Sequence, residues 1–422
     1  MDIVVKQNNY KSLIINALFA LIPFSFILGN FFINLNIFFF IFFTFFSYNR
    51  ELISLKFNLL DKIIILFFIY IFLVLTINFL EAWWKNEIFS KIIINKTFAY
   101  LRYFFLYVSI KVLLNRNLLK LNLFYSSCAF FSIFICIDIY IQYFFGRDIF
   151  GISPVSPLKL SGVFGEELIA GGYIQRFCFF SFFLPLIFKK NKILIYLLLI
   201  SVFAVGIALS GNRMPLILFI LSFLLFFIID KNLRNNFTTI VLLLMVVFSF
   251  LYFNNKGIQD NFSALPKNVD RLIKIHITKE LSYEEDSLKH KTPYSLEILC
   301  FTHVWKKNKF FGGGVRSYRV NAPGCNTHPG NYYFEILDDL GIIGFCIIII
   351  LILSILYKAY FKKNTFLYSA NFDLKILPFF ILFLVEFFPI RSSGSFFSTN
   401  NATFIFIILA LLISSIDKYR EE

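Results

Sequence analysis

Charged residues and histidines are scarce in this chain. Of its 422 residues only 15% are Asp, Glu, Lys or Arg, and there are 4 His and 6 Cys. The sequence contains no Walker-type phosphate loop, no G-x-G-x-x-G run, no C-x-x-C pair and no H-E-x-x-H motif. These absences exclude a soluble ATPase domain and a soluble redox domain.

Apolar residues are abundant instead. The hydrophobic share is 59% and the mean hydropathy is +0.76. Repeated apolar runs of about 17 residues or more are long enough to cross a bilayer, so they indicate an all-α integral membrane protein. We read the whole chain, 1–422, as a single polytopic membrane domain. Twelve spans are predicted, at 13–28, 31–47, 63–80, 98–114, 121–144, 173–188, 193–210, 214–229, 237–253, 333–357, 376–390 and 401–416.

The distribution of Lys and Arg predicts the orientation of these spans. Segment 13–28 lacks a small-residue cleavage site, so it is interpreted as a retained first span and not as a signal peptide. Most Lys and Arg residues of the short loops fall on the side of the two termini, which is therefore the cytoplasmic side. The large loop 254–332, between spans nine and ten, then faces outward. The net charge of +15 reflects this orientation and does not indicate nucleic acid.

Charged residues inside the predicted spans lie mostly near their outer ends. Arg102, Asp138, Arg176 and Glu386 follow this rule, whereas Lys111 lies near an inner end, where it is expected to reach the membrane surface. A transporter is expected to carry charges near the membrane midplane. The bias toward one rim favours a fixed site that opens outward.

Two outward segments carry arginines that suit an anion. Arg213, in "SGNRMP", precedes Pro215 at the start of span eight, and a helix N-terminus beside an Arg attracts phosphate. Gly312 to Gly314 are followed by Arg316 and Arg319 in "FFGGGVRSYR", where a flexible backbone can approach a ligand closely. The alternatives are an interfacial anchor for Arg213 and an ordinary turn for the glycines.

The segment "CNTHPGNYYFEILDDLGIIGF", 325–345, combines a His with a helix start and an acidic cluster. His328 precedes the predicted N-terminus of span ten, whose dipole disfavours a proton on the imidazole, so we expect a neutral His. Glu335, Asp338 and Asp339 fall in the first turns of that helix. The alternative is an interfacial His beside a solvated acidic cap. His276, His290 and His303 are expected at the surface, and the sequence shows no set of metal ligands.

The cysteines divide into two groups. Cys300 and Cys325 fall in the outer loop and can pair in an oxidising compartment, although their spacing leaves this open. The others lie in predicted spans and are read as apolar residues, namely Cys128, Cys136, Cys178 and Cys346.

Four segments together resemble the O-antigen ligase and O-antigen polymerase superfamily of bacterial membrane glycosyltransferases. They are "SGVFGEELIAGGY" (161–173), "SGNRMPLI", "HVWKKNKFFGGGVRSYR" and "THPGNYYFEILDDLGIIGF". The resemblance covers about residues 160 to 350. The chain departs from the family pattern at Gly165 to Glu167, where Asn is common, and at Gly330.

The resemblance implies an enzyme of the bacterial inner membrane with a periplasmic active site. Its donor is a glycan on undecaprenyl pyrophosphate, and its acceptor is a hydroxyl of lipid A-core or of a second lipid-linked glycan. It implies inversion at the sugar carbon, with no metal and no other cofactor. Arg213, Arg316 and Arg176 would hold the diphosphate and His328 would be the general base. Supporting positions are expected at Glu335, Asp338 and Asn331.

The residues leave three functions open. A ligase and a polymerase differ in acceptor alone, and the sequence does not separate them. The alternative of another class is a flippase for lipid-linked oligosaccharides or another transporter. A transporter predicts midplane charges and internal repeats, and the sequence shows neither.

Overall fold

The computed structural model describes most of the chain as helices. The described residues are 2–156, 159–183, 192–229, 293–322, 324–361, 377–391 and 394–418, with isolated residues between 242 and 263. Within these ranges the extended structure amounts to one isolated bridge between Ser156 and Lys159. The predicted all-α class is therefore confirmed. Most of span 237–253 and most of loop 254–292 lie outside the described residues, as do His276 and His290.

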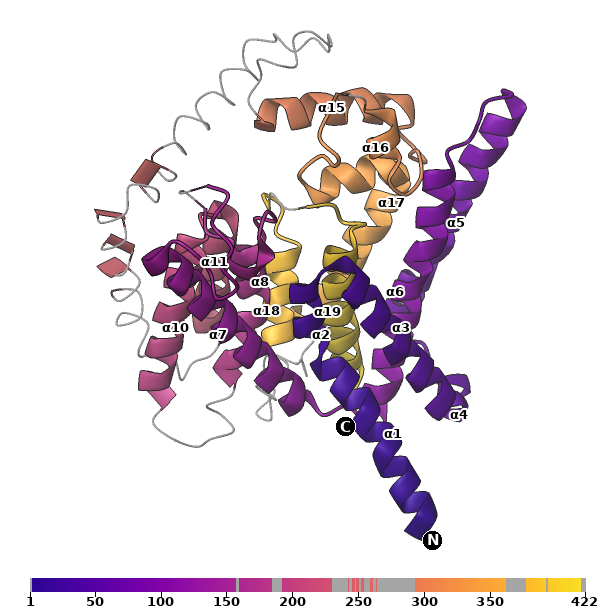
Figure 1. Ribbon diagram of the computed structural model, residues 1–422. Coiled ribbons are helices and arrows are strands. Elements are labelled where there is room, and N and C mark those ends of the chain that lie inside the picture. The colour runs from indigo at the N-terminus through magenta and orange to yellow at the C-terminus, as the bar shows by residue number, and fades with distance from the viewer. Residues whose placement is uncertain are drawn as a thin grey trace. The chain divides into compact units, whose positions relative to one another are not determined.

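The chain divides into two compact units, each assembled from separate stretches of sequence. Figure 1 shows their helices. The described helices of the first unit are α1 (Asp2–Ala20), α2 (Ile22–Leu28), α3 (Asn30–Ser47), α7 (Leu121–Phe145), α8 (Ala170–Phe177), α10 (Lys192–Leu209), α11 (Arg213–Ile229) and α18 (Leu377–Glu386), with short 3-10 turns η1 (Gly162–Phe164) and η2 (Cys178–Phe183). Those of the second unit are α4 (Asn49–Ile53), α5 (Leu59–Trp84), α6 (Lys91–Asn115), α15 (Pro293–Lys307), α16 (Ser317–Asn321), α17 (Tyr332–Leu356), the π-helical turn η4 (Tyr357–Phe361) and α19 (Thr399–Lys418).

The predicted number of spans is not confirmed. Six described helices are long and apolar enough to cross a membrane, or seven if α1 and α2, which meet at 45°, form one bent span. Three further predicted spans correspond to shorter apolar helices, Ile195–Leu209, Arg213–Phe226 and Leu377–Glu386. The predicted span 173–188 begins as α8 but continues as the 3-10 turn η2 from Cys178. Hydropathy predicted spans at these positions but does not report that the helices there are short or irregular.

The second unit has α19 at its centre. In the most apolar 18-residue stretch of α19, 89% of the helix is buried, as expected for a helix that is hydrophobic on all sides. It packs along α6, where the rings of Tyr103 and Phe406 are stacked with centroids 6.0 Å apart. Helices α15 and α16 contact α17 in the same unit (Figure 1).

Lys111 on α6 corrects one prediction. Its side chain does not reach the membrane surface but is fully buried, with Nζ 2.7 Å from Asp61 and 2.8 Å from Asp417. Tyr107 donates a further hydrogen bond to Asp61. These partners lie on α5 and α19, far away in the sequence. A buried ammonium group is stabilised when it is paired and hydrogen-bonded, so this cluster fixes the three helices to one another.

α17 is broken near its first third. Gly341 has φ 65° and ψ −171°, which only glycine adopts readily, and it separates the stretch that begins at Tyr332 from the apolar remainder. The loop after α15 inserts at this break. Ile342 N donates to Lys309 O (2.9 Å), while Gly313 N and Gly314 N donate to the carbonyls of Asp338 and Asp339 (3.0 and 2.8 Å). The backbone groups freed by the break are thus satisfied by the loop.

The three glycines 312–314 serve this contact. A Cβ on Gly312 would lie 2.5 Å from the backbone of Asp339, and one on Gly341 would lie 2.2 Å from Phe310 O. The sequence predicted that these glycines approach a ligand closely. In the structure they approach the backbone of α17 instead, and the arginine that follows them is positioned by that contact.

Candidate active site

Asp339 holds the segment that carries Arg316. Its buried carboxylate accepts hydrogen bonds from Arg316 N (2.6 Å), Ser317 Oγ (2.9 Å) and Tyr318 N (3.0 Å). These bonds stabilise Arg316 in the left-handed conformation, φ 68°, at the start of α16. The Nε atom of Arg316 is buried and has no acceptor among the described residues. Its backbone is therefore fixed while its guanidinium group retains an unused donor.

His328 lies in the turn before α17. Asn331 caps that helix by accepting from Tyr333 N (2.8 Å) and donates to Pro389 O (2.9 Å). The half-buried imidazole of His328 accepts a hydrogen bond on Nδ1 from Gly330 N (3.2 Å). Burial, and then the charge of Arg316, lower the pKa of His328, so the ring is neutral near pH 7. The pKa of His328 is therefore lowered, as predicted, but the main cause is burial and not the helix dipole.

The hydrogen bond from Gly330 fixes the tautomer of the neutral ring. With Nδ1 as the acceptor, the proton lies on Nε2. His328 in this state donates from Nε2 and takes a proton on Nδ1. Nδ1 is thus the basic nitrogen of the neutral ring, and the Gly330 N–H occupies it.

Glu297 on α15 was not predicted as a site residue. Its carboxyl group lies against Gly330, where an added Cβ would be 2.4 Å from Oε2. Burial raises the pKa of Glu297 to about 7, and the hydrogen bond from Asn326 opposes this shift. A carboxyl group with such a pKa exchanges protons near neutrality. Sequence periodicity carries no signal for it, because only the fold brings α15 to the turn of His328.

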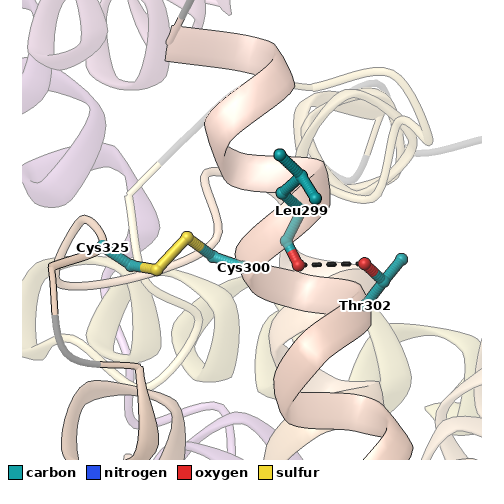
Figure 2. Close-up of a disulfide and its surroundings, with 4 residues drawn as sticks. All are labelled: Leu299, Cys300, Thr302 and Cys325. Carbon is teal, nitrogen blue, oxygen red and sulfur yellow. Dashed lines mark hydrogen bonds between the residues drawn. A yellow bond between two sulfur atoms is a disulfide. The ribbon is translucent and has the colours of Figure 1, made fainter. Parts of the chain in front are cut away.

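The disulfide between Cys300 and Cys325 joins the same two segments. The Cα atoms are 6.2 Å apart, and the bond links α15 to the loop that leads to His328 (Figure 2). The pairing that the sequence left open is thus present. It anchors the turn of His328 to the helix that carries Glu297.

The other two carboxylates of α17 are buried, so the alternative of a solvated acidic cap is wrong. Glu335 accepts from Ser395 Oγ (2.6 Å) and Phe396 N (2.5 Å), which fixes the segment before α19. Asp338 is 2% exposed, and its carboxylate has no hydrogen-bond partner among the residues that the structure describes. Glu335 and Asn331 therefore act in the structure as positioning groups.

Two of the predicted arginines belong to the first unit. Arg213 is the first residue of α11, with Pro215 in the first turn as predicted, and the neighbouring Asn212 donates to Leu168 O (3.0 Å). Arg176 on α8 is buried and donates to Glu386 Oε1 on α18 (2.6 Å). Arg316 and His328 belong to the second unit. The charge of Arg176 is balanced within its own unit, whereas described residues offer no carboxylate ion pair to Arg316.

We expect Glu297→Gln to change how stability depends on pH. The folded-state pKa of about 7 lies above the ordinary 4.5, so the contribution of the protonated carboxyl is complete below pH 4.5 and is lost as pH rises through 7. Gln is uncharged throughout. The unfolding temperature of the wild type should therefore fall more steeply between pH 5 and 8 than that of the variant, in a thermal-shift assay.

Glu87→Gln is the matched control, because Glu87 is an exposed carboxylate of the same unit. It should leave the pH profile of the wild type unchanged. Parallel profiles for wild type and Glu297→Gln would show that Glu297 does not titrate in this range.

The fold and the site together define a class of protein. The chain is an all-helical membrane protein in which a neutral His, an arginine with an unused donor and buried carboxylates gather around one broken helix. Residues 195–350 match the family model described as O-Antigen ligase, so this part of the chain is similar to that family. No curated protein and no solved structure matches the chain. The matched region includes Arg213, Arg316 and His328, while Arg176 lies outside it.

Proposed function

We propose that the chain is an O-antigen ligase. It moves a glycan from undecaprenyl pyrophosphate to a hydroxyl of lipid A-core at the periplasmic face of the bacterial inner membrane. The observation that carries the proposal is the O-Antigen ligase match over 195–350, which contains Arg213, Arg316 and His328. Among these, His328 and Arg316 interact electrostatically within one unit.

The reaction is one direct displacement. The acceptor oxygen attacks the anomeric carbon, the bond from that carbon to the diphosphate oxygen breaks, and the configuration inverts. The acceptor proton passes to Nδ1 of His328, where it replaces the hydrogen bond from Gly330. Undecaprenyl pyrophosphate leaves with the bonding electrons. The step requires neither a nucleotide sugar nor a metal ion.

Arginines stabilise the leaving group as its charge grows. The buried Nε of Arg316 is a donor with no acceptor among the described residues, and Arg213 opens a helix whose N-terminus favours an anion. Arg176 would have to give up Glu386 to bind phosphate, so it contributes less than the other two. Glu335, Asp338 and Asn331 support the site, Asn331 by capping the start of α17 and Glu335 by holding the segment before α19.

Deletion of the gene in its host tests the proposal through the lipopolysaccharide ladder. A ligase predicts complete loss of glycan-capped core, with restoration by the wild-type gene. A single repeat on the core would instead identify a polymerase, the second candidate. Lipid-linked glycan trapped on the cytoplasmic face would identify a flippase. Reporter fusions at residue 310 should report the periplasm, and a cytoplasmic signal would overturn the site.

A further inference from the structure

Two cations on α6 extend the surroundings of Arg316. Lys96 interacts electrostatically with Arg102 on its own helix and with Arg316 and Arg319 at α16. All four residues belong to the second unit. The ion pairs within the described residues involve none of them. Cations that gather without a salt bridge in the described ranges repel one another, and an anion reduces that repulsion.

Two arginines of this group, Arg102 and Arg316, are held by hydrogen bonds but keep a donor unused. Arg102 donates from Nη2 to Tyr103 Oη (2.7 Å) and Thr399 Oγ1 (3.4 Å), and its guanidinium carbon lies 4.7 Å from the centre of the Tyr103 ring. Its Nε is buried, with no acceptor in the described part of the chain, and the same holds for Nε of Arg316. A buried donor without an acceptor is costly, so both point to a ligand that supplies oxygen atoms.

The remaining groups complete the site. Lys96 and Arg319 are exposed, so their charged ends are accessible to a ligand from solvent. Tyr100 lies one turn after Lys96 on α6, and its buried hydroxyl lacks a hydrogen-bond partner among the residues described. The nearby carboxylates, Glu335 and Asp339, already accept hydrogen bonds from their own segments.

We propose that Lys96, Arg102, Arg316 and Arg319 form one anion-binding site, which takes a phosphate-bearing group. Guanidinium groups bind phosphate oxygens through paired N–H donors, and Lys adds a point charge. The choice of ligand rests on the proposed function, in which Arg316 binds the diphosphate of the lipid-linked donor. Two sources supply the same chemistry, namely the diphosphate of the lipid-linked donor and a phosphate on the acceptor oligosaccharide.

Titration calorimetry on the purified full chain in detergent micelles tests the site, with inorganic pyrophosphate as the probe. We expect binding that weakens as salt increases. Arg102→Gln and Lys96→Gln should each lower the affinity about 10-fold, because each removes a charge-assisted contact. Lys91→Gln is the control, as Lys91 is an exposed cation of the same helix, and it should bind as the wild type does. Arg102→Lys should recover part of the loss.

Equal affinity in wild type, Lys96→Gln and Arg102→Gln would overturn the site, as would an equal loss in Lys91→Gln. Lys96 is exposed, so its variant tests the site even if Arg102→Gln fails to fold. Pyrophosphate binding that depends on Arg102, in a protein that transfers no glycan, would uphold the site and remove the proposed function. If the protein transferred glycan and neither substitution changed transfer or pyrophosphate binding, the site would be overturned and the proposed function would stand.

Two further arms separate the sources of the phosphate. If the donor occupies the site, Lys96→Gln lowers the affinity for undecaprenyl pyrophosphate about 10-fold. If the acceptor occupies it, the same substitution raises KM for a phosphorylated acceptor about 10-fold and leaves KM for the phosphatase-treated acceptor unchanged. If Lys96→Gln changes neither the affinity for undecaprenyl pyrophosphate nor KM for the phosphorylated acceptor, the result contradicts the site.

Discussion

His328→Ala is expected to lower the rate of glycan transfer by ~10²–10⁴, the usual contribution of a general base. The substitution removes the ring that accepts the substrate proton but leaves Arg316 held by Asp339. Affinity for undecaprenyl pyrophosphate should therefore stay close to that of the wild type. Transfer is measured with purified protein, lipid-linked donor and acceptor, and donor affinity is measured separately.

His303→Ala is the control, because His303 lies on α15 outside the turn of His328. It should retain nearly normal transfer. Near-normal transfer by His328→Ala would remove His328 from the mechanism. The base would then be sought first at Glu297, whose carboxyl group lies against Gly330 and has a pKa of about 7.

Gly341→Ala is expected to abolish most activity without touching a substrate group. Its backbone conformation, φ 65° and ψ −171°, is confined almost wholly to glycine, and an added Cβ would lie 2.2 Å from Phe310 O. The loop 309–314 must then move, and Arg316 with it. Displacement of a positioned group by about 1 Å can cost ~10² in rate, so we expect at least that loss.

The same variant should show a structural change that an altered catalytic group would not. Hydrogen exchange in 309–319 should become faster, because the bonds from Gly313 and Gly314 to α17 weaken. Gly172→Ala is the control, since a Cβ at Gly172 meets nothing within 4 Å. Unchanged exchange together with normal transfer would show that the loop is not docked at a break in α17.

The sequence predicted the helical class because that class depends on local composition, while the outward position of the arginine segments and the role of His328 stay predictions. It did not predict the break at Gly341, because this residue lies inside the continuous span predicted at 333–357. The break is stable only because a loop thirty residues earlier supplies hydrogen bonds to it. No local pattern reports such a partner.

The same limit explains why the partners of two buried cations were not predicted. Lys111 pairs with Asp61 and Asp417, and Arg176 pairs with Glu386, all across large separations in sequence. Position within a span was the available guide, and it cannot reveal an ion pair between helices. Sequence analysis also did not single out Glu297, whose carboxyl group lies against Gly330, or Lys96, which interacts electrostatically with Arg316.

The disulfide also has a consequence for the entropy of folding. Cys300 and Cys325 are separated by 25 residues, and the loop that they close contains the three glycines and Arg316. Glycine loses more conformational freedom on folding than any other residue, so this segment is unusually costly to order. By loop-closure arguments the cross-link restricts the unfolded chain enough to favour the native state by about 3 to 4 kcal/mol. The bond thus offsets the flexibility that the glycine contact with α17 requires.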